Sequence, residues 1–212
     1  MSRPLIELRG LAAADSYFRE FPKLANTAAR LTVNSSARFG ARLTSKIVRS
    51  QVAFARNYIG AAGAVGSKIR IKKFAGGNDL EAVIASLDRP TSLARFATGT
   101  PTFGKRVRGG RGPAVRIKTG SKNLKRAFFV KLKRGAVLTD EGFNIGLAIR
   151  LPKGQKPDAS QKASPLGGGA YLLYGPSVAQ VFDTSMDRDI SPSVADFASV
   201  EFFRQFARLT RG

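Results

Sequence analysis

The sequence predicts an α+β protein with long helices near its amino terminus, a twisted and mostly antiparallel sheet, and helices at its carboxyl terminus. Two observations carry this prediction. Residues 23–58 contain no proline and place apolar side chains at helical spacing, and a helical pattern returns after Pro176. Between these segments, short apolar runs alternate with Gly, Pro and Asp turn signals, which is typical of strands and hairpins.

The amino-terminal third predicts one long amphipathic helix over residues 23–58. Phe39, Leu43 and Ile47 follow one another at intervals of four residues, as expected for one face of a helix. Gly40 is the position where we expect an irregularity in this helix. Basic residues occupy much of the remaining surface, and the sequence leaves open whether this basic face is simply solvated or contacts an acidic neighbour.

The glycine-rich segment 60–68 follows the helical pattern and invites comparison with a phosphate-binding loop. Such a loop needs Gly-x4-Gly-Lys-Ser/Thr directly after a strand, so that backbone N–H groups and the lysine surround a triphosphate. Here Ser67 precedes Lys68, and the preceding segment is helical. We therefore interpret the segment as a helix terminator and hinge.

The middle of the chain predicts strands. The turn residues Gly76 to Asp79 separate the first two apolar runs and suit a β-hairpin. A later run, Tyr171 to Tyr174, predicts a buried strand. The other strand predictions cover residues 69–72, 80–87, 114–118, 127–133 and 143–151.

We expect one domain, since a chain of 212 residues can bury a sizeable core and no internal repeat is visible. Two loops are expected to be mobile because they are rich in Gly, Pro, Ser and basic residues; they lie near residues 105–113 and 155–169. The domain, 1–212, is divided into a helical region at 1–60, a basic sheet region at 61–174 and carboxyl-terminal helices at 175–212.

A fixed corner is predicted where the last strand meets the carboxyl-terminal helices. Gly175 suits a positive φ or a close approach of another group, and Pro176 suits the first turn of a helix. The helix after this corner is expected over 178–186, and Ser191 is expected to cap the final helix. Apolar residues recur along that helix and favour core or subunit interface: Val194, Phe197, Phe202, Phe206 and Leu209.

The charge balance points to an anionic partner. The chain holds 36 basic and 14 acidic residues, a formal net charge of +22. Residues 61–136 carry 18 basic and 3 acidic residues, whereas residues 137–212 carry 8 of each. Such an imbalance repels itself unless a polyanion or an acidic protein surface lies nearby.

Catalytic and metal chemistry find little support. The sequence has no Cys and no His, which removes thiol nucleophiles, zinc-finger ligands and the usual neutral-pH general base. Asp183, Asp187 and Asp189 do not match the calcium-loop spacing, and Ser177 does not lie in a Gly-x-Ser-x-Gly elbow. We expect no enzyme activity, no cofactor and no metal.

A membrane span or a secretory signal is also not expected. The longest uncharged run, residues 163–182, contains two prolines and four glycines, and the amino terminus lacks an apolar signal core. We expect a protein that is made and kept in the cytoplasm and has no membrane contact.

Basic residues between positions 105 and 134 form the candidate contact site. Twelve positive charges and no acid occupy these 30 residues, a density that suits phosphate contacts without sequence readout. An acidic protein surface would satisfy the same charges, and the sequence leaves both partners open. The candidate residues are Lys105, Arg106, Arg108, Arg111, Arg116, Lys118, Lys122, Lys125 and Arg126.

The order of these features resembles the prophage minor tail protein Z family, the tail-completion proteins of tailed bacteriophages. A helical amino-terminal third precedes a basic strand region, an Ala127-Phe128 strand and a strand that ends in Arg150. The most specific match is the motif that follows, made of Leu173, Tyr174, Gly175, Pro176, Ser177 and Val178. The loop at 155–169 departs from the compact pattern of the family.

The resemblance implies a structural virion protein at the head-proximal end of a phage tail. Such a protein forms a homo-oligomeric ring, joins the tail to other neck, connector or tail proteins, and borders the channel through which DNA leaves. The basic region would then contact packaged DNA or acidic neighbours. The alternative from another class is a free cytoplasmic nucleic-acid-binding protein that acts through non-specific phosphate contacts.

Overall fold

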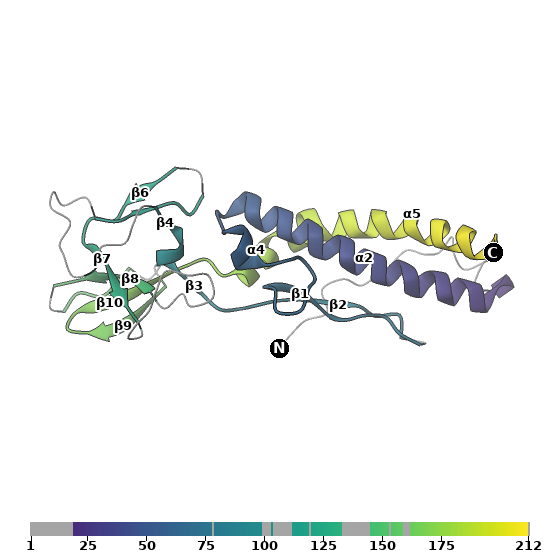
Figure 1. Cartoon of the computed structure of the whole chain (residues 1–212), viewed down its shortest axis with the longest axis horizontal. Helices are drawn as coiled ribbons and strands as arrows, with labels where there is room; N and C mark the ends of the chain where they lie inside the picture. The colour runs from purple at the N-terminus through teal and green to yellow at the C-terminus, as the bar shows by residue number, and fades with distance from the viewer. Residues whose placement is uncertain are drawn as a thin grey trace. The chain divides into compact units, whose positions relative to one another are not determined.

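The computed structural model describes residues 19–77, 79–98, 103, 112–118, 120–132, 145–152, 154–158 and 162–211. It confirms the α+β class, with an amino-terminal helix, antiparallel sheets and carboxyl-terminal helices (Figure 1). Contacts divide the chain into two compact units. Unit 1 comprises residues 1–48, 59–87 and 179–212, and unit 2 comprises residues 49–58 and 88–178. The predicted single domain stays a prediction, and its three sequence regions do not coincide with these units.

The long amino-terminal helix, α2, spans Pro22–Gln51 without interruption. Gly40 is buried inside the helix and causes no break, contrary to the irregularity expected there. The helix ends seven residues earlier than predicted because the chain then bonds elsewhere: the backbone N–H of Ala53 donates to the carbonyl of Ile117 at 2.7 Å. A short helix, α3 (Arg56–Ile59), follows. Gly60 comes next with a φ of +78°, which confirms the predicted helix terminator.

The buried face of α2 consists of small residues rather than the large apolar residues that defined the predicted stripe. Phe39, Leu43 and Ile47 are only half-buried. Ala and Thr or Ser side chains line the interior instead, and a helix with such a face can be approached closely by a neighbour. The buried positions are Ala25, Ala28, Ala29, Thr32, Ser36, Ala37, Gly40, Ala41, Thr44, Ser45 and Val48.

The neighbour of this face in unit 1 is the last helix, α5 (Ser191–Thr210). The start of α2 contacts the end of α5, since Ala25, Ala28 and Ala29 form one buried cluster with Phe202 and Phe206. Further along, the rings of Phe39 and Phe197 stack at 4.4 Å with an interplanar angle of 3°. The two helices therefore run antiparallel, as Figure 1 shows. This packing confirms the core role predicted for the aromatic residues of the last helix.

The hairpin predicted around Gly76–Asp79 is confirmed in unit 1. Strands β1 (Ile69–Lys73) and β2 (Val83–Ser86) pair antiparallel, and Gly76 bridges Asp79 at the turn. Asn34 of α2 holds the hairpin: its amide donates to the carbonyl of Ala75 at 3.1 Å, and its side-chain oxygen accepts from the Ala75 N–H at 2.8 Å. These two bonds fix the hairpin against the long helix.

The carboxyl-terminal helices form one continuous segment, contrary to the predicted cap at Ser191. Helix α4 (Val178–Ser185) passes into a π-helical turn, η3 (Met186–Ile190), and then into α5. Ser191 is itself helical, with φ −59° and ψ −47°, and its N–H donates to the carbonyl of Met186. The widened turn accommodates Pro192, which has no N–H for the helical ladder, so the chain does not leave the helix.

Unit 2 contains two antiparallel sheets. The larger sheet has the order β3 (Thr91–Ser92), β10 (Ala170–Gly175), β8 (Ile145–Arg150) and β7 (Ala127–Lys131), and β9 (Ala163–Gly167) also pairs with β10. The smaller sheet has the order β4 (Ala97–Thr98), β5 (Ala114–Val115) and β6 (Lys122–Asn123). A 3-10 helix, η2 (Leu93–Phe96), precedes β4. The buried strand predicted at Tyr171–Tyr174 is confirmed as part of β10.

The loop predicted over residues 155–169 is wrong for its second half. Residues 163–167 form β9, which pairs with β10 in a hairpin. Gly168 and Gly169 make the turn with φ values of +58° and +72°, the positive values that a tight hairpin turn requires. Pro165 is compatible with β9 because this strand lies at the edge of the sheet, where a missing N–H breaks no ladder. In the other predicted loop, residues 104–111 lie outside the described residues.

The corner of the family-like motif is a close approach and not a positive-φ turn. Gly175 is not among the described residues with positive φ. A Cβ atom on Gly175 would lie 2.8 Å from Cε2 of Phe96 and 3.5 Å from Cδ1 of Leu93. Leu173, Gly175, Ser177 and Val178 are buried, whereas Tyr174 and Pro176 are half-buried. The motif therefore packs the end of β10 against η2 within unit 2.

Replacing Gly175 by Val should destabilise unit 2 because the added side chain would overlap the ring of Phe96. Overpacking a buried site costs about 1–3 kcal/mol of unfolding free energy. Chemical denaturation followed by far-UV circular dichroism measures this loss. Pairing Gly175→Val with Phe96→Leu, which withdraws the ring, should recover part of it. No recovery in the double variant would contradict the close-approach explanation.

Candidate functional site

Positive charge is concentrated in unit 2. By composition, unit 2 contains 20 basic and 4 acidic residues, a net charge of +16, whereas unit 1 contains 16 basic and 10 acidic residues, a net charge of +6. Several cations of unit 1 have acidic partners. Lys73 lies 2.6 Å from Asp79, and Arg188 lies 2.8 Å from Asp189. The cations available to an external anion are therefore sought in unit 2.

Five of the nine predicted contact residues lie in the described part of unit 2, and all five are exposed: Arg116, Lys118, Lys122, Lys125 and Arg126. They occupy strand β6 and the loops on either side of it, so a single segment brings them together. None of the five forms an ion pair with a described residue. We call these five residues the basic patch. The other four predicted residues, Lys105, Arg106, Arg108 and Arg111, lie outside the described residues.

Backbone hydrogen bonds hold the basic patch in place. Strands β5 and β6 pair through Val115 and Lys122, and the N–H of Leu124 donates to the carbonyl of Pro113 at 3.0 Å. A turn follows, closed by a 3.0 Å bond from the Ala127 N–H to the Leu124 carbonyl. The patch is thus presented by a hairpin and a tight turn rather than by an unstructured loop.

Arg126 occupies a strained position in this turn. Its φ of +138° is the only positive value among the described residues other than glycine. Glycine adopts such values without steric cost, whereas strain of this kind in a residue with a side chain costs on the order of 1–3 kcal/mol. An arginine at such a position is a reason to consider a role for its side chain, and Arg126 is exposed.

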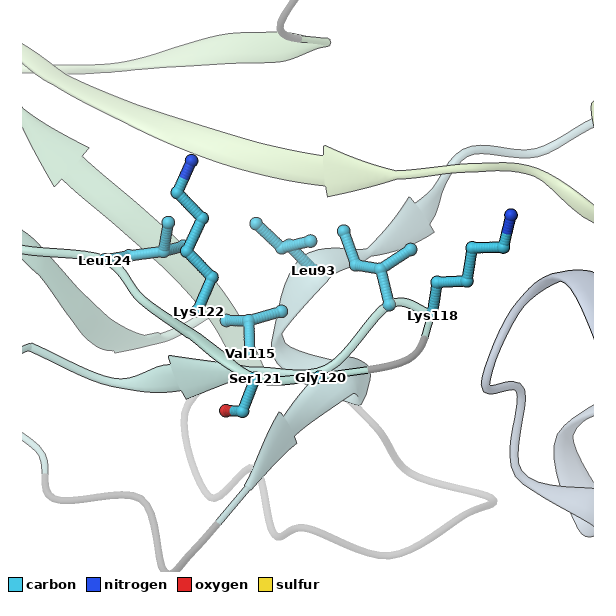
Figure 2. Close-up of a pocket in the computed structure, with 8 residues that line it drawn as sticks. Leu93, Val115, Lys118, Gly120, Ser121, Lys122 and Leu124 are labelled. Carbon is cyan, nitrogen blue, oxygen red and sulfur yellow. The ribbon is translucent and has the colours of Figure 1, made fainter.

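A shallow pocket of about 340 Å³ adjoins the basic patch (Figure 2). Its apolar wall combines buried Leu93 and Val115 with Leu124, which is half-buried, and Ile117, which is 37% exposed. Figure 2 shows Lys122 on one side of Leu93 and Lys118 on the other, with both amino groups pointing the same way. Gly120 and Ser121 complete the lining. The pocket thus has an apolar wall between two cations.

The sequence alone predicts the two lysines of this pocket but not the pocket itself. Charge density along the chain identified Lys118 and Lys122. The apolar wall combines Leu93 of η2 with side chains of β5 and of the loops beside β6. A backbone hydrogen bond of 2.7 Å, from the Arg116 N–H to the Phe96 carbonyl, holds η2 next to β5. The apolar residues of segment 114–124 gave no separate signal, since they read equally well as core.

The acidic residues considered for metal binding do not gather. Among the described residues, no three acidic side chains lie close enough to hold a metal ion together. Asp189 pairs with Arg188, and the hydrogen bond from Arg188 lowers the pKa of the Asp189 carboxyl. The Ser177 hydroxyl donates to Asp88 at 3.4 Å, a contact that ties the motif to the residues before β3.

Comparisons of the chain with protein-family models, curated proteins and solved structures gave no match. Within the described residues, no helix has the length and apolar character needed to cross a membrane.

Proposed function

We propose that this protein is a tail-completion or neck component of a tailed bacteriophage. In this proposal it is a structural virion protein at the head-proximal end of the tail, assembles as a homo-oligomeric ring, and contacts neighbouring connector or tail proteins. It needs no catalytic residue and no cofactor. The observation that supports the proposal best is the basic patch, five exposed cations on one hairpin of a unit with a net charge of +16. The tail-completion motif at Leu173–Val178 supplies the family context.

A ring multiplies the effect of the basic patch. Heterologous interfaces generate closed rings, so every subunit presents the same patch in the same orientation. Exposed cations that lack ion pairs can neutralise phosphates, and each contact releases counterions without reading sequence. No aromatic residue belongs to the patch, so stacking on unpaired bases is not part of the proposal. Duplex DNA in transit through the ring is the partner that fits these features.

The test is the salt dependence of binding to a fluorescently labelled DNA duplex, measured by fluorescence anisotropy. We expect the variant Arg116→Gln, Lys125→Gln, Arg126→Gln to bind more weakly, because three phosphate contacts are lost. The slope of log K against log salt should fall by about 0.9 for each contact, or about 2.7 for all three. These three residues lie outside the pocket lining.

The matched control removes the same charge from unit 1 through Lys23→Gln, Arg42→Gln and Lys46→Gln, all at exposed positions of α2. It should keep the slope of the unmodified protein. Equal slopes for the two triple variants would contradict a role for the basic patch. Native mass spectrometry of the purified protein tests the ring: an oligomer of defined subunit number supports the neck protein, whereas a DNA-binding monomer favours the free nucleic-acid-binding alternative.

A further inference from the structure

The pocket beside the basic patch has a composition that DNA does not explain. A phosphate backbone needs cations and hydrogen-bond donors, and it gains nothing from an apolar wall. Ile117 lines the pocket together with Lys118 and Lys122 and is 37% exposed, whereas the lining residues Leu93 and Val115 are buried. Apolar surface that is rimmed by charged residues is typical of a site where a protein or a ligand binds.

The two lysines restrict the kind of occupant. Neither Lys118 nor Lys122 forms an ion pair with a described residue, and both stand beside the same apolar wall (Figure 2). Their charges repel each other unless an anion lies between or beside them. The occupant should therefore bring an apolar group to the wall and negative charges to the rim. The pocket volume of about 340 Å³ is near the lower limit of ligand pockets and suits a single large side chain.

We propose that this pocket binds an acidic segment of a protein partner, with one large apolar side chain against the wall and flanking carboxylates beside Lys118 and Lys122. The inference rests on the proposed function, since the partner would be a neighbouring protein of the neck or connector. It divides the basic patch into two parts, since Lys118 and Lys122 line the pocket and the other three cations do not. Arg116, Lys125 and Arg126 face phosphates, whereas the lysine-flanked pocket takes an acidic, apolar peptide.

Labelled synthetic peptides provide the test. The first probe is a short peptide of Asp and Glu residues with one central Phe; the second has Ser in place of the Phe, and a duplex DNA carries the same label. At an ionic strength of about 0.15 M, where long-range charge effects are screened, we expect the Phe peptide to bind about tenfold more tightly than the Ser peptide. That ratio is typical of burying one apolar group, roughly 1.4 kcal/mol.

Variants at the pocket assign the binding. Ile117→Ser should weaken the Phe peptide by about tenfold and leave the Ser peptide unchanged, because only the apolar contact is lost. Lys118→Gln with Lys122→Gln should weaken both peptides and reduce their salt dependence. The control, Lys23→Gln with Lys72→Gln, removes the same charge at exposed sites of unit 1 and should bind like the unmodified protein. Far-UV circular dichroism confirms that each variant is folded.

Two results would overturn the inference. One is equal affinity for the Phe and Ser peptides, or a Phe peptide that is indifferent to Ile117→Ser. The other is a Lys118/Lys122 variant that loses duplex DNA affinity as strongly as peptide affinity, which would make the pocket part of the DNA surface. Failure of the proposed function would give a different result. The Arg116, Lys125, Arg126 variant would then show the same slope of log K for duplex DNA against log salt as the unmodified protein, while peptide binding stayed intact.

Discussion

Substituting Gly146 by Ala should destabilise the protein more than its single added methyl group suggests. Gly146 is buried in β8, which lies between β10 and β7 in the larger sheet. A Cβ atom there would lie 2.2 Å from Cδ1 of Leu172 and 3.2 Å from Cγ1 of Val130. Overpacking of this kind costs about 1–3 kcal/mol of unfolding free energy. Urea denaturation at constant pH measures the loss.

A double-mutant cycle tests whether Leu172 is the cause. Leu172→Ala alone should cost about 2–5 kcal/mol, since a large buried side chain is truncated. In the double variant the Ala at 146 fills space that Leu172 has left, so the combined loss should be smaller than the sum by about 0.5–3 kcal/mol. Gly76→Ala is the control, because a Cβ there meets nothing within 4 Å. Strict additivity at 146 and 172 would contradict the steric explanation.

Local sequence signals predicted the elements that local interactions decide. The hairpin of β1 and β2 follows from alternating residues around the Gly76–Asp79 turn, and the strand before Gly175 follows from its apolar run. The β9–β10 hairpin was missed because three successive glycines were interpreted as flexibility. All three glycines have a positive φ, and Gly168 and Gly169 form the turn between the two strands. Successive glycines suit a mobile loop as well as a tight hairpin turn. Only the pairing of the flanking segments into strands distinguishes the turn from the loop.

The buried face of α2 could not be predicted from the spacing of its large apolar residues alone. Large apolar residues at helical intervals indicated a stripe around Phe39 and Leu43, yet small residues such as Ala25 and Ala28 form the buried side. What fills the space beside them is Phe202 of α5, far away in the sequence. The spacing of side chains within one helix does not reveal which distant residues pack against it, so it cannot show that large side chains of another helix fill the space beside small ones.

The candidate site shows the same division between local and distant information. Charge density is a property of the sequence, so the exposed cations of the basic patch were identified without a structure. The pocket between Lys118 and Lys122 depends on Leu93, which reaches the hairpin through tertiary contacts of η2. The strain at Arg126 likewise became visible only as a backbone angle.

Glu201 of α5 is the buried acid whose loss should affect unit 1 most. Its side chain is 5% exposed and accepts hydrogen bonds from Arg204 at 2.6 and 2.7 Å and from the Gln205 amide at 2.6 Å. Glu201→Ala would leave the buried Gln205 amide without this acceptor. Loss of such a buried hydrogen-bond partner costs about 1–3 kcal/mol. Thermal and urea unfolding of the unmodified protein and of Glu201→Ala at neutral pH measure the difference in unfolding free energy.

The pH dependence separates the charge of Glu201 from its shape. The hydrogen bond from Arg204 is the largest influence and lowers the pKa of the Glu201 carboxyl below its ordinary value, although burial alone would raise the pKa. A carboxyl with a lowered pKa in the folded state stabilises the protein above its unfolded pKa of about 4.5, and this contribution is lost as the pH falls through the folded pKa.

Glu201→Gln is the matched control, because it keeps an oxygen that can accept from Gln205 and removes the titrating group. The unmodified protein should be more stable than this variant at pH 7, and the difference should shrink as the pH falls below about 4.5. Denaturation midpoints across the acidic range measure it. A difference that stays constant with pH would show that the Arg204 pair contributes no charge-dependent stability, leaving packing as the role of Glu201.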